Sequence, residues 1–240
     1  MILDRIEKLQ VLTVGILVVI AVLMAAKLIT ATISGNTISV TGSAYEIVKS
    51  DSGSLSFSVN TKCTTKQEAY KAMQSSMQTL EKYLADKKIT KIEKKNINGY
   101  YNYKRDVRGN YTDIPENYNM SQNVTISSDD VELIKEIAND ITGLINQGID
   151  INVYDTSYSY SKLPELKVSL LEKASVDAKK RAASMLKATH NHPGKIQSVR
   201  MGVYQITPVD SNDVSDMGIN DSSTIDKKVT AVANITFKIK

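Results

Sequence analysis

The sequence predicts an α+β protein with a mixed, mainly antiparallel sheet and helices packed on one face, preceded by one N-terminal transmembrane helix. Three observations support this prediction. An uncharged apolar segment lies near the N-terminus, several later segments alternate between apolar and polar residues, and three segments repeat apolar residues every three or four positions. We therefore expect a membrane anchor over residues 1–35 and one extracytoplasmic domain over residues 36–240.

The predicted anchor centres on residues 11–26, which include no charged residue. Extending it to residues 9–29 gives the ~20 residues that a helix needs to cross a bilayer. Arg5 and Lys8 precede the segment, and this bias favours a single pass with the N-terminus in the cytoplasm and the body outside. A cleaved signal peptide is the alternative, although its apolar core is usually shorter, about 7–15 residues.

Two strands and a helix are expected at the start of the body. Residues 37–49 fit a strand, and residues 52–59 alternate cleanly, as in a strand with one buried face. Thr65 and Glu68 have the spacing of a capping box and open a helix of about 22 residues. The predicted buried stripe of this helix is Tyr70, Met73, Met77, Leu80 and Leu84.

A long hairpin and a second helix follow. Residues 89–104 fit a strand, a turn signal follows at residues 108–110, and the chain returns through residues 118–126. Asp129 and Glu132 open a helix whose predicted buried stripe is Ile134, Ile137, Ile141 and Leu144. Residues 52–105 and 116–160 therefore share a strand–helix–strand pattern, which hints at an internal repeat.

The last third of the chain predicts a helix, two strands and a loop. The helix runs from Leu163 to about Thr189, and residues 195–205 fit a strand. Residues 208–227 are polar and predict a mobile loop, whereas residues 229–240 alternate as a strand. The predicted buried stripe of the helix is Leu170, Ala174, Ala178, Ala182 and Met185.

No recognisable catalytic motif is present. The sequence has neither a Gly-x-Ser-x-Gly elbow nor a Gly-x-x-x-x-Gly-Lys phosphate loop, and no glycine-rich turn joins a strand to a helix. The net charge is only +4 and the basic residues are spread along the sequence, which argues against nucleic acid as a partner. We therefore expect a protein that is not an enzyme and carries no cofactor.

Cys63 is the one cysteine, so no intramolecular disulfide can form. It lies where a strand pattern gives way to a helix, and a thiol near a helix N-terminus can be reactive. A thiol-based redox sensor is therefore one hypothesis for this residue. The alternative, which we favour, is a small and partly buried side chain without a chemical role.

The two histidines, His190 and His192, form a His-x-His pair. Such a pair can bind a transition metal, but a site needs a third ligand and an ordered geometry. Their position at the predicted end of a helix, before Pro193 and Gly194, is explained equally well by a polar helix terminus. A metal-binding module at this pair is a secondary hypothesis, and we assign no metal ligand here.

Tyrosines are unusually concentrated in the predicted hairpin. The chain has twelve tyrosines, and the hairpin holds Tyr100, Tyr101, Tyr103, Tyr111 and Tyr118. Because tyrosine is enriched at protein interfaces, these residues predict a contact surface. Cross-strand pairing within a sheet is the alternative explanation.

The order of these elements resembles the SIMPL-domain family of bacterial periplasmic and cell-surface proteins. The resemblance covers roughly residues 37–240. It rests on the first strand, residues 38–44 (ISVTGSA), the strand of residues 118–126 (YNMSQNVTI), and the segment of residues 155–160 (DTSYSY) leading into a helix with Asp177 and Arg181. These motifs are structural, and the family supplies no catalytic residues.

The resemblance implies an α+β body, ring-like self-association, and a link to envelope function and oxidative-stress defence. We therefore expect a membrane-anchored, non-enzymatic cell-envelope protein that forms a homo-oligomer or binds an envelope protein partner.

Overall fold

The computed structural model describes residues 13–27 and 36–240. Contacts divide the body into two compact units. Unit 1 comprises residues 36–44, 171–202 and 232–240, and unit 2 comprises residues 45–170 and 203–231. Strand pairing gives two five-stranded sheets where the sequence predicted one. The pairs within them are mainly antiparallel, and one pair is parallel.

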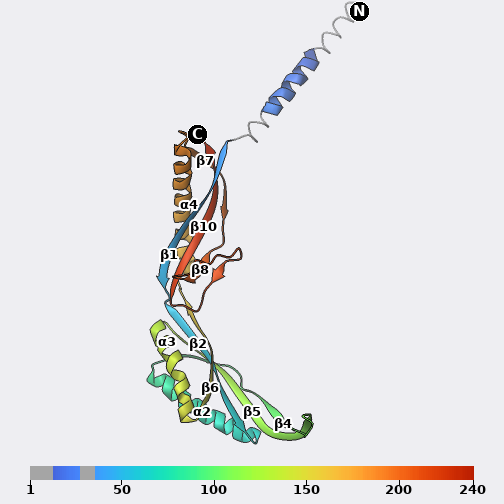
Figure 1. Cartoon of the computed structure of the whole chain (residues 1–240), viewed down its shortest axis with the longest axis vertical. Helices are drawn as coiled ribbons and strands as arrows, with labels where there is room; N and C mark the ends of the chain where they lie inside the picture. Colours follow the sequence, from blue (N-terminus) through green and yellow to red (C-terminus); the bar gives the residue numbers. More distant parts are fainter. Residues whose placement is uncertain (1–12, 28–35) are drawn as a thin grey trace, which may run out of the picture. The chain divides into compact units, whose positions relative to one another are not determined.

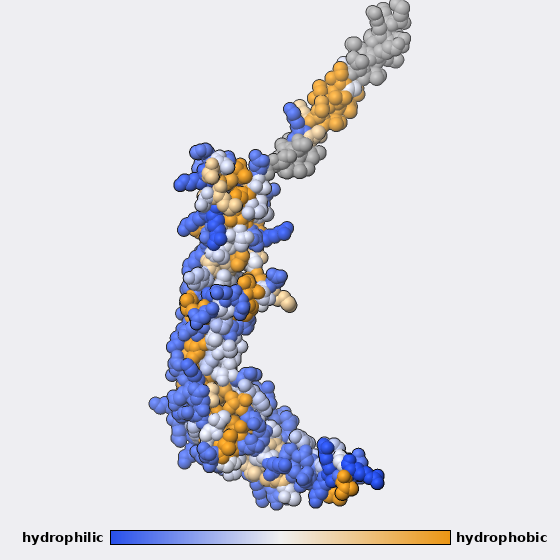
Figure 2. Space-filling model, in the orientation of Figure 1, coloured by the Kyte–Doolittle hydropathy of each residue, from blue (hydrophilic) through white to orange (hydrophobic). Residues whose placement is uncertain are grey.

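Residues 13–27 are helical, and their apolar side chains are exposed (Figure 2). Within the residues that the structure describes, no helix is both long enough and apolar enough to cross a membrane. The first and last residues of the predicted span, 9–12 and 28–29, lie outside the described residues.

Unit 2 contains a β-α-β-β-α-β arrangement, the ferredoxin-like topology (Figure 1). The strand order is β3-β5-β2-β6, and β4 continues the β3 edge alongside β5. The two halves coincide with the repeated pattern seen in the sequence. The elements are β2 (Ser52–Cys63), α2 (Lys66–Asp86), β3 (Lys91–Lys94), β4 (Asn98–Arg105), β5 (Tyr111–Ser128), α3 (Val131–Asp140), the 3-10 helix η1 (Ile141–Gln147) and β6 (Asp150–Ser159).

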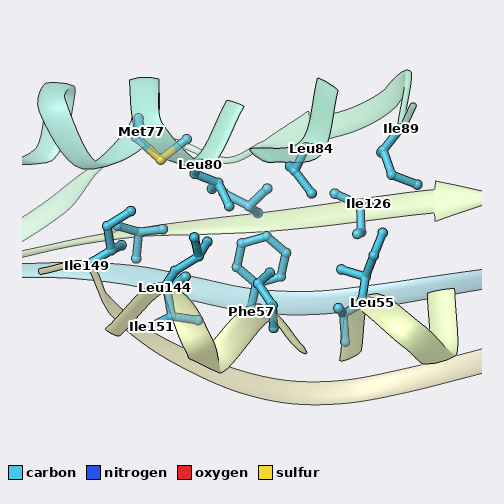
Figure 3. Packing of buried hydrophobic residues seen from close by; sticks show 14 of the residues in the cluster. Leu55, Phe57, Met77, Leu80, Leu84, Ile89, Ile126, Leu144, Ile149 and Ile151 are labelled. Atoms are coloured by element: carbon cyan, nitrogen blue, oxygen red, sulfur yellow. The ribbon is translucent and has the colours of Figure 1, made fainter. Parts of the chain in front are cut away.

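The core of unit 2 lies between one face of this sheet and its helices (Figure 3). Leu55, Phe57 and Val59 alternate along β2 and are fully buried, as their spacing predicted. The predicted stripe of α2 is right except at Tyr70, which is exposed, because Ala69 occupies the buried position. The stripe from Ile134 to Leu144 is buried throughout, although the helix tightens to η1 at Ile141.

Local capping explains where these helices begin. The Thr65 hydroxyl accepts from the Glu68 backbone N–H at 3.2 Å, and the Glu68 carboxylate accepts from the Thr65 N–H at 3.1 Å. This confirms the predicted capping box. For α3 the cap is Asp130, whose carboxylate accepts from the N–H groups of Glu132 and Leu133.

Unit 1 holds three strands of the other five-stranded sheet, covered by one helix. Strand β10 (Asp226–Ile239) lies between β1 (Thr37–Lys49) and β7 (Pro193–Met201). Helix α4 (Leu163–Lys187) packs its alanines on this sheet, where the fully buried Ala174, Ala178 and Ala182 meet Val40, Ile235 and Phe237. The prediction that Met185 is buried is wrong, because Met185 is exposed. Leu186 is buried instead, since the buried stripe continues from Ala182 at a spacing of four residues.

The polar segment 208–227 is held by a buried ion pair. It follows β8 (Gln205–Pro208), and within it β9 (Ile219–Asn220) pairs in parallel with β8. The Lys227 ammonium donates to the Asp221 backbone carbonyl at 2.7 Å and lies 3.3 Å from its carboxylate, with both side chains nearly inaccessible to solvent. The sequence predicted a mobile loop because its apolar content is low, and composition gave no sign of this buried pair.

Candidate functional site

The predicted tyrosine cluster lies on a hairpin of unit 2 built from β4 and β5. Among the residues that the structure describes, strand β4 pairs with β5 alone, so it is an edge of the sheet. Tyr101 lies opposite Tyr118, and Tyr100 lies opposite Asn119. The register shifts on either side of Tyr103, which lies opposite Pro115. The structure therefore brings together the five tyrosines that the sequence singled out.

The hairpin turn is braced by Asp106. Its carboxylate accepts from the backbone N–H groups of Asn110 at 2.9 Å and Arg108 at 2.8 Å. Hydrogen bonding, foremost from the Asn110 N–H, holds the pKa of Asp106 below its ordinary value. Gly109 has a φ of +86°, a conformation that glycine adopts without steric cost. The turn is thus stabilised by the hydrogen bonds of the Asp106 carboxylate and by the backbone conformation of Gly109.

Four of the five tyrosines are exposed on the hairpin, and Tyr100 and Tyr101, as neighbours along β4, lie on opposite faces of it. Tyr100 and Tyr111 are the most accessible, with 62% and 70% of their surface exposed, and Tyr101 and Tyr103 are each 41% exposed. Tyr118 is a correction: only 7% of it is exposed, because it faces the core cluster of unit 2. It supports the surface from beneath through an edge-to-face contact with Tyr101, with ring centroids 4.6 Å apart.

The exposed rings are held in place by polar contacts. The Arg105 guanidinium donates to the Tyr111 hydroxyl at 2.7 Å and lies 4.4 Å from the centroid of its ring. The Asn119 amide donates to the Tyr100 hydroxyl at 3.3 Å. A side chain at Gly99 would meet the Tyr118 ring at 2.7 Å, so this glycine permits the close approach of β4 to β5.

Val107 and Ile114 extend this surface with apolar side chains. Neither residue was singled out from the sequence, although Val107 directly precedes the turn signal at residues 108–110 and Ile114 follows it by four residues. We call Tyr100, Tyr101, Tyr103, Tyr111, Val107 and Ile114 the hairpin surface. It offers apolar area, phenolic hydroxyls and a strand edge, which are the features of a contact site rather than of a reaction centre.

Cys63 ends β2 and lies opposite Tyr118 in the strand register. Its side chain is partly buried and packs against the core of unit 2. The sequence placed it correctly at the junction of a strand and a helix. Its redox role stays a prediction of the sequence.

The two histidines lie just beyond the end of α4 in unit 1. His190 has a φ of +56°, and the His192 backbone exchanges two hydrogen bonds of 2.9 Å with Lys240. Both side chains are exposed. Across residues 13–27 and 36–240, no group of three or more His, Cys, Asp or Glu side chains is arranged to hold a metal ion.

A cleft of about 690 Å³ opens in unit 2, and no sequence motif predicted it. Tyr158, one of its lining residues, is largely buried, and this burial raises the pKa of its hydroxyl above the ordinary value. The cleft is lined by Ile47, Glu132, Lys135, Tyr158, Pro208, Val209, Asp210, Ser223, Thr224, Ile225 and Asp226.

The motifs that carried the family resemblance serve packing. A Cβ atom on Gly42 would lie 2.2 Å from the Ala174 carbonyl oxygen, so β1 touches α4 at this point. The next residue, Ser43, donates its backbone N–H to the Asp177 carboxylate at 2.9 Å, and the Arg181 guanidinium donates to the same oxygen at 2.7 Å. Strand β1 and helix α4 are thus joined by the close contact at Gly42 and by the hydrogen bond from Ser43 to the Asp177 carboxylate.

Comparison with known proteins supports the family resemblance that these packing motifs carry. No match is found among curated proteins. The family model of SIMPL, described as a protein of unknown function (DUF541), matches residues 38–237. This match spans the strand β1, the alanine face of α4 and most of β10. The chain therefore belongs to the SIMPL family.

Proposed function

We propose that this protein is a non-enzymatic cell-envelope protein, attached to a membrane through residues 9–29, which acts by contact of its hairpin surface with another protein chain. The observation that carries the proposal is the exposed hairpin surface on an edge strand. The occupant is a second copy of the chain or an envelope protein partner.

Two physical features favour this surface as a contact site. Tyrosine supplies large contact area with few rotatable bonds, and the contacts of Tyr100 and Tyr111 order their side chains before any partner arrives. Strand β4 has an unpaired edge along which a further strand can add its backbone hydrogen bonds. The first feature lowers the entropic cost of association, and the second adds backbone hydrogen bonds to the interface.

Membrane attachment rests on the sequence of residues 9–29 and on the exposed apolar side chains of residues 13–27. Exposed apolar side chains such as Leu17 and Leu23 are costly in water and favourable in hydrocarbon. Attachment would keep residues 36–240 at the outer surface of the membrane, where the hairpin surface could meet an envelope protein partner. The nanodisc experiment described below tests this part directly.

The hairpin surface is tested by the association of the full chain in mild detergent. We expect sedimentation velocity to show concentration-dependent association, weakened by the double variant Tyr100→Ser, Tyr111→Ser. Two central aromatic contacts at about 1–2 kcal/mol each correspond to a loss of roughly 30-fold or more in affinity. The matched control is Tyr45→Ser, Tyr70→Ser, which removes two exposed tyrosines outside the hairpin.

If the wild-type chain is a monomer at all concentrations, self-association is wrong and a partner protein is the remaining occupant. A photo-crosslinking residue at Tyr111, used in cells, then has to capture a single defined protein. Failure of both measurements, or an equal loss of association in the control variant, would contradict the proposal.

A further inference from the structure

Folding separates the charges of the chain more sharply than its net charge of +4 indicates. The described segments of unit 1 hold nine lysine and arginine residues against two acidic residues. In unit 2 the balance reverses, with eighteen basic residues against twenty-two acidic ones. The basic residues look dispersed in sequence because unit 1 is assembled from three separate segments.

One end of unit 1 gathers three chain segments that are far apart in sequence. The Ile239 backbone N–H donates to the Asn36 carbonyl at 2.8 Å, so β10 ends beside the start of β1. Lys240 in turn exchanges two backbone hydrogen bonds with His192, which follows α4 and precedes β7. The C-terminus, β7 and the start of β1 lie together at this end in Figure 1. We call it the Asn36 end.

The Asn36 end carries cations without neutralising carboxylates. The exposed ammonium groups there belong to Lys187, Lys195, Lys238 and Lys240, and no ion pair joins any of them within the described residues. Asp177, the nearer acidic residue on α4, lies about 15 Å before Lys187 along the helix axis. A carboxylate at Lys240 would offset one charge and leave the end cationic.

The Asn36 end is also where the predicted anchor joins the body. Only residues 30–35 separate the predicted span from Asn36, and such a length of chain reaches at most about 25 Å in any conformation. If residues 9–29 occupy a membrane, the cations of this end therefore lie close to the lipid headgroups. Lys187 comes from the helix and Lys195 and Lys238 from two strands, so the charge surrounds the end rather than one broad face.

We infer that the Asn36 end docks on anionic phospholipid headgroups and so holds unit 1 against the membrane surface. The inference rests on the membrane attachment proposed above and adds a lipid class and a docking surface to it. A basic residue near an anionic membrane strengthens binding by about fivefold, so three of them together contribute on the order of 100-fold. A nucleic acid is less suited as partner, because the cations lie beside the point of membrane attachment.

The test places the full chain in nanodiscs and measures contact between the Asn36 end and the headgroups. A fluorophore is attached at Ala188→Cys, an exposed position after α4, in a Cys63→Ser background. The lipids carry a nitroxide quencher on the headgroup, in phosphatidylcholine with or without phosphatidylglycerol. We expect stronger quenching with phosphatidylglycerol, and loss of the difference near 1 M salt, where the Debye length falls to about 3 Å.

The decisive variant is Lys187→Gln, Lys195→Gln, Lys240→Gln, which should weaken docking on the order of 100-fold and abolish the lipid-dependent quenching. The matched control is Lys66→Gln, Lys71→Gln, Lys82→Gln on α2, which removes equal charge from unit 2 and should leave quenching unchanged. Circular dichroism checks that both variants fold.

Three results would overturn the inference. Equal quenching in the two lipid mixtures, or equal loss in the two variants, would show that the Asn36 end does not recognise anionic headgroups. Binding of a soluble polyanion that depends on the same lysines, without any lipid effect, would assign this end to that polymer. A chain that does not enter nanodiscs at all would instead refute the membrane attachment, and the inference would fall with it.

Discussion

Gly42 is the position where a single methyl group should do the most damage to unit 1. A Cβ atom there would lie 2.2 Å from the Ala174 carbonyl oxygen, 2.4 Å from the Ala178 backbone nitrogen and 2.7 Å from the Ala178 Cβ. These neighbours belong to the backbone and first side-chain atoms of α4, which cannot rotate away. We predict that Gly42→Ala strongly destabilises the protein.

The magnitude follows from how far α4 would have to move. Restoring an ordinary carbon–oxygen contact requires a retreat of about 1 Å or more. Such a shift loosens the packing of three fully buried alanines along α4. Overpacking costs typically 1–3 kcal/mol, while replacing glycine by alanine within a strand recovers roughly 0.5–1 kcal/mol. Because backbone atoms clash, the overpacking cost should lie at the upper end of that range, and we expect a net loss of about 2 kcal/mol.

Urea unfolding of the full chain, followed by circular dichroism, measures this loss. For an m-value of about 2–3 kcal/mol/M, the midpoint should fall by about 1 M. The control is Gly143→Ala in η1, where a Cβ atom meets nothing within 4 Å, so stability should stay the same or rise slightly. Hydrogen exchange should assign the loss to residues 171–187.

A second variant tests whether the clash with the backbone of α4 causes the loss. Ala178→Gly, combined with Gly42→Ala, removes one of the three close contacts and leaves the clash with the Ala174 carbonyl. The combination should therefore not restore wild-type stability. A midpoint for Gly42→Ala within about 0.2 M of wild type would refute the reasoning, because the strand would then have room that the packing denies.

Two further predictions concern buried and hydrogen-bonded charges. The Ser43 N–H lowers the pKa of Asp177, so its stabilisation is present at neutral pH and is lost as the pH falls through the folded-state value. Asp177→Asn should therefore lose about 1 kcal/mol at neutral pH, and unfolding curves of variant and wild type should converge in acid; curves that stay apart there would contradict this. Lys227→Met leaves the Asp221 carboxylate buried without its partner and should cost about 3–5 kcal/mol, whereas adding Asp221→Asn should recover part of the loss. A double-mutant cycle in urea measures the coupling, and a value near zero would show that the pair contributes nothing.

Local features of the fold were predictable because their causes are local. Thr65 and Glu68 form the capping box that their spacing indicates, and Leu55, Phe57 and Val59 are buried as their alternation requires. The errors in the predicted buried stripes of the helices occur where either of two neighbouring residues fits the apolar spacing. Tyr70 and Met185 both fit an apolar spacing, but Ala69 and Leu186 are the buried residues instead. Only the packing of helix on sheet decides between them.

Features that depend on long-range contacts could not be predicted from the sequence, for a different reason. The Asp221–Lys227 pair, the cleft at Tyr158 and the separation into two sheets depend on which segments meet. The five tyrosines of the hairpin could be identified from their clustering, but not the burial of Tyr118, which depends on the core beneath it. The same limit hid the charge of unit 1, since its basic residues come from segments that folding alone brings together.

In sequence order, the central strand of unit 1 comes after every other strand that the structure describes, and this order constrains how the protein can fold. Strands β2 to β6 of unit 2 follow one another within residues 52–159, so their sheet can close early. The unit 1 sheet has to join β1 to β10 across most of the chain, and contacts of such sequence separation form slowly. During synthesis or export, β1 and α4 therefore wait with unsatisfied apolar faces until residues 232–240 emerge. A chaperone that shields those faces would act in this interval, and shortening the chain before residue 232 would leave unit 1 without the strand around which it is built.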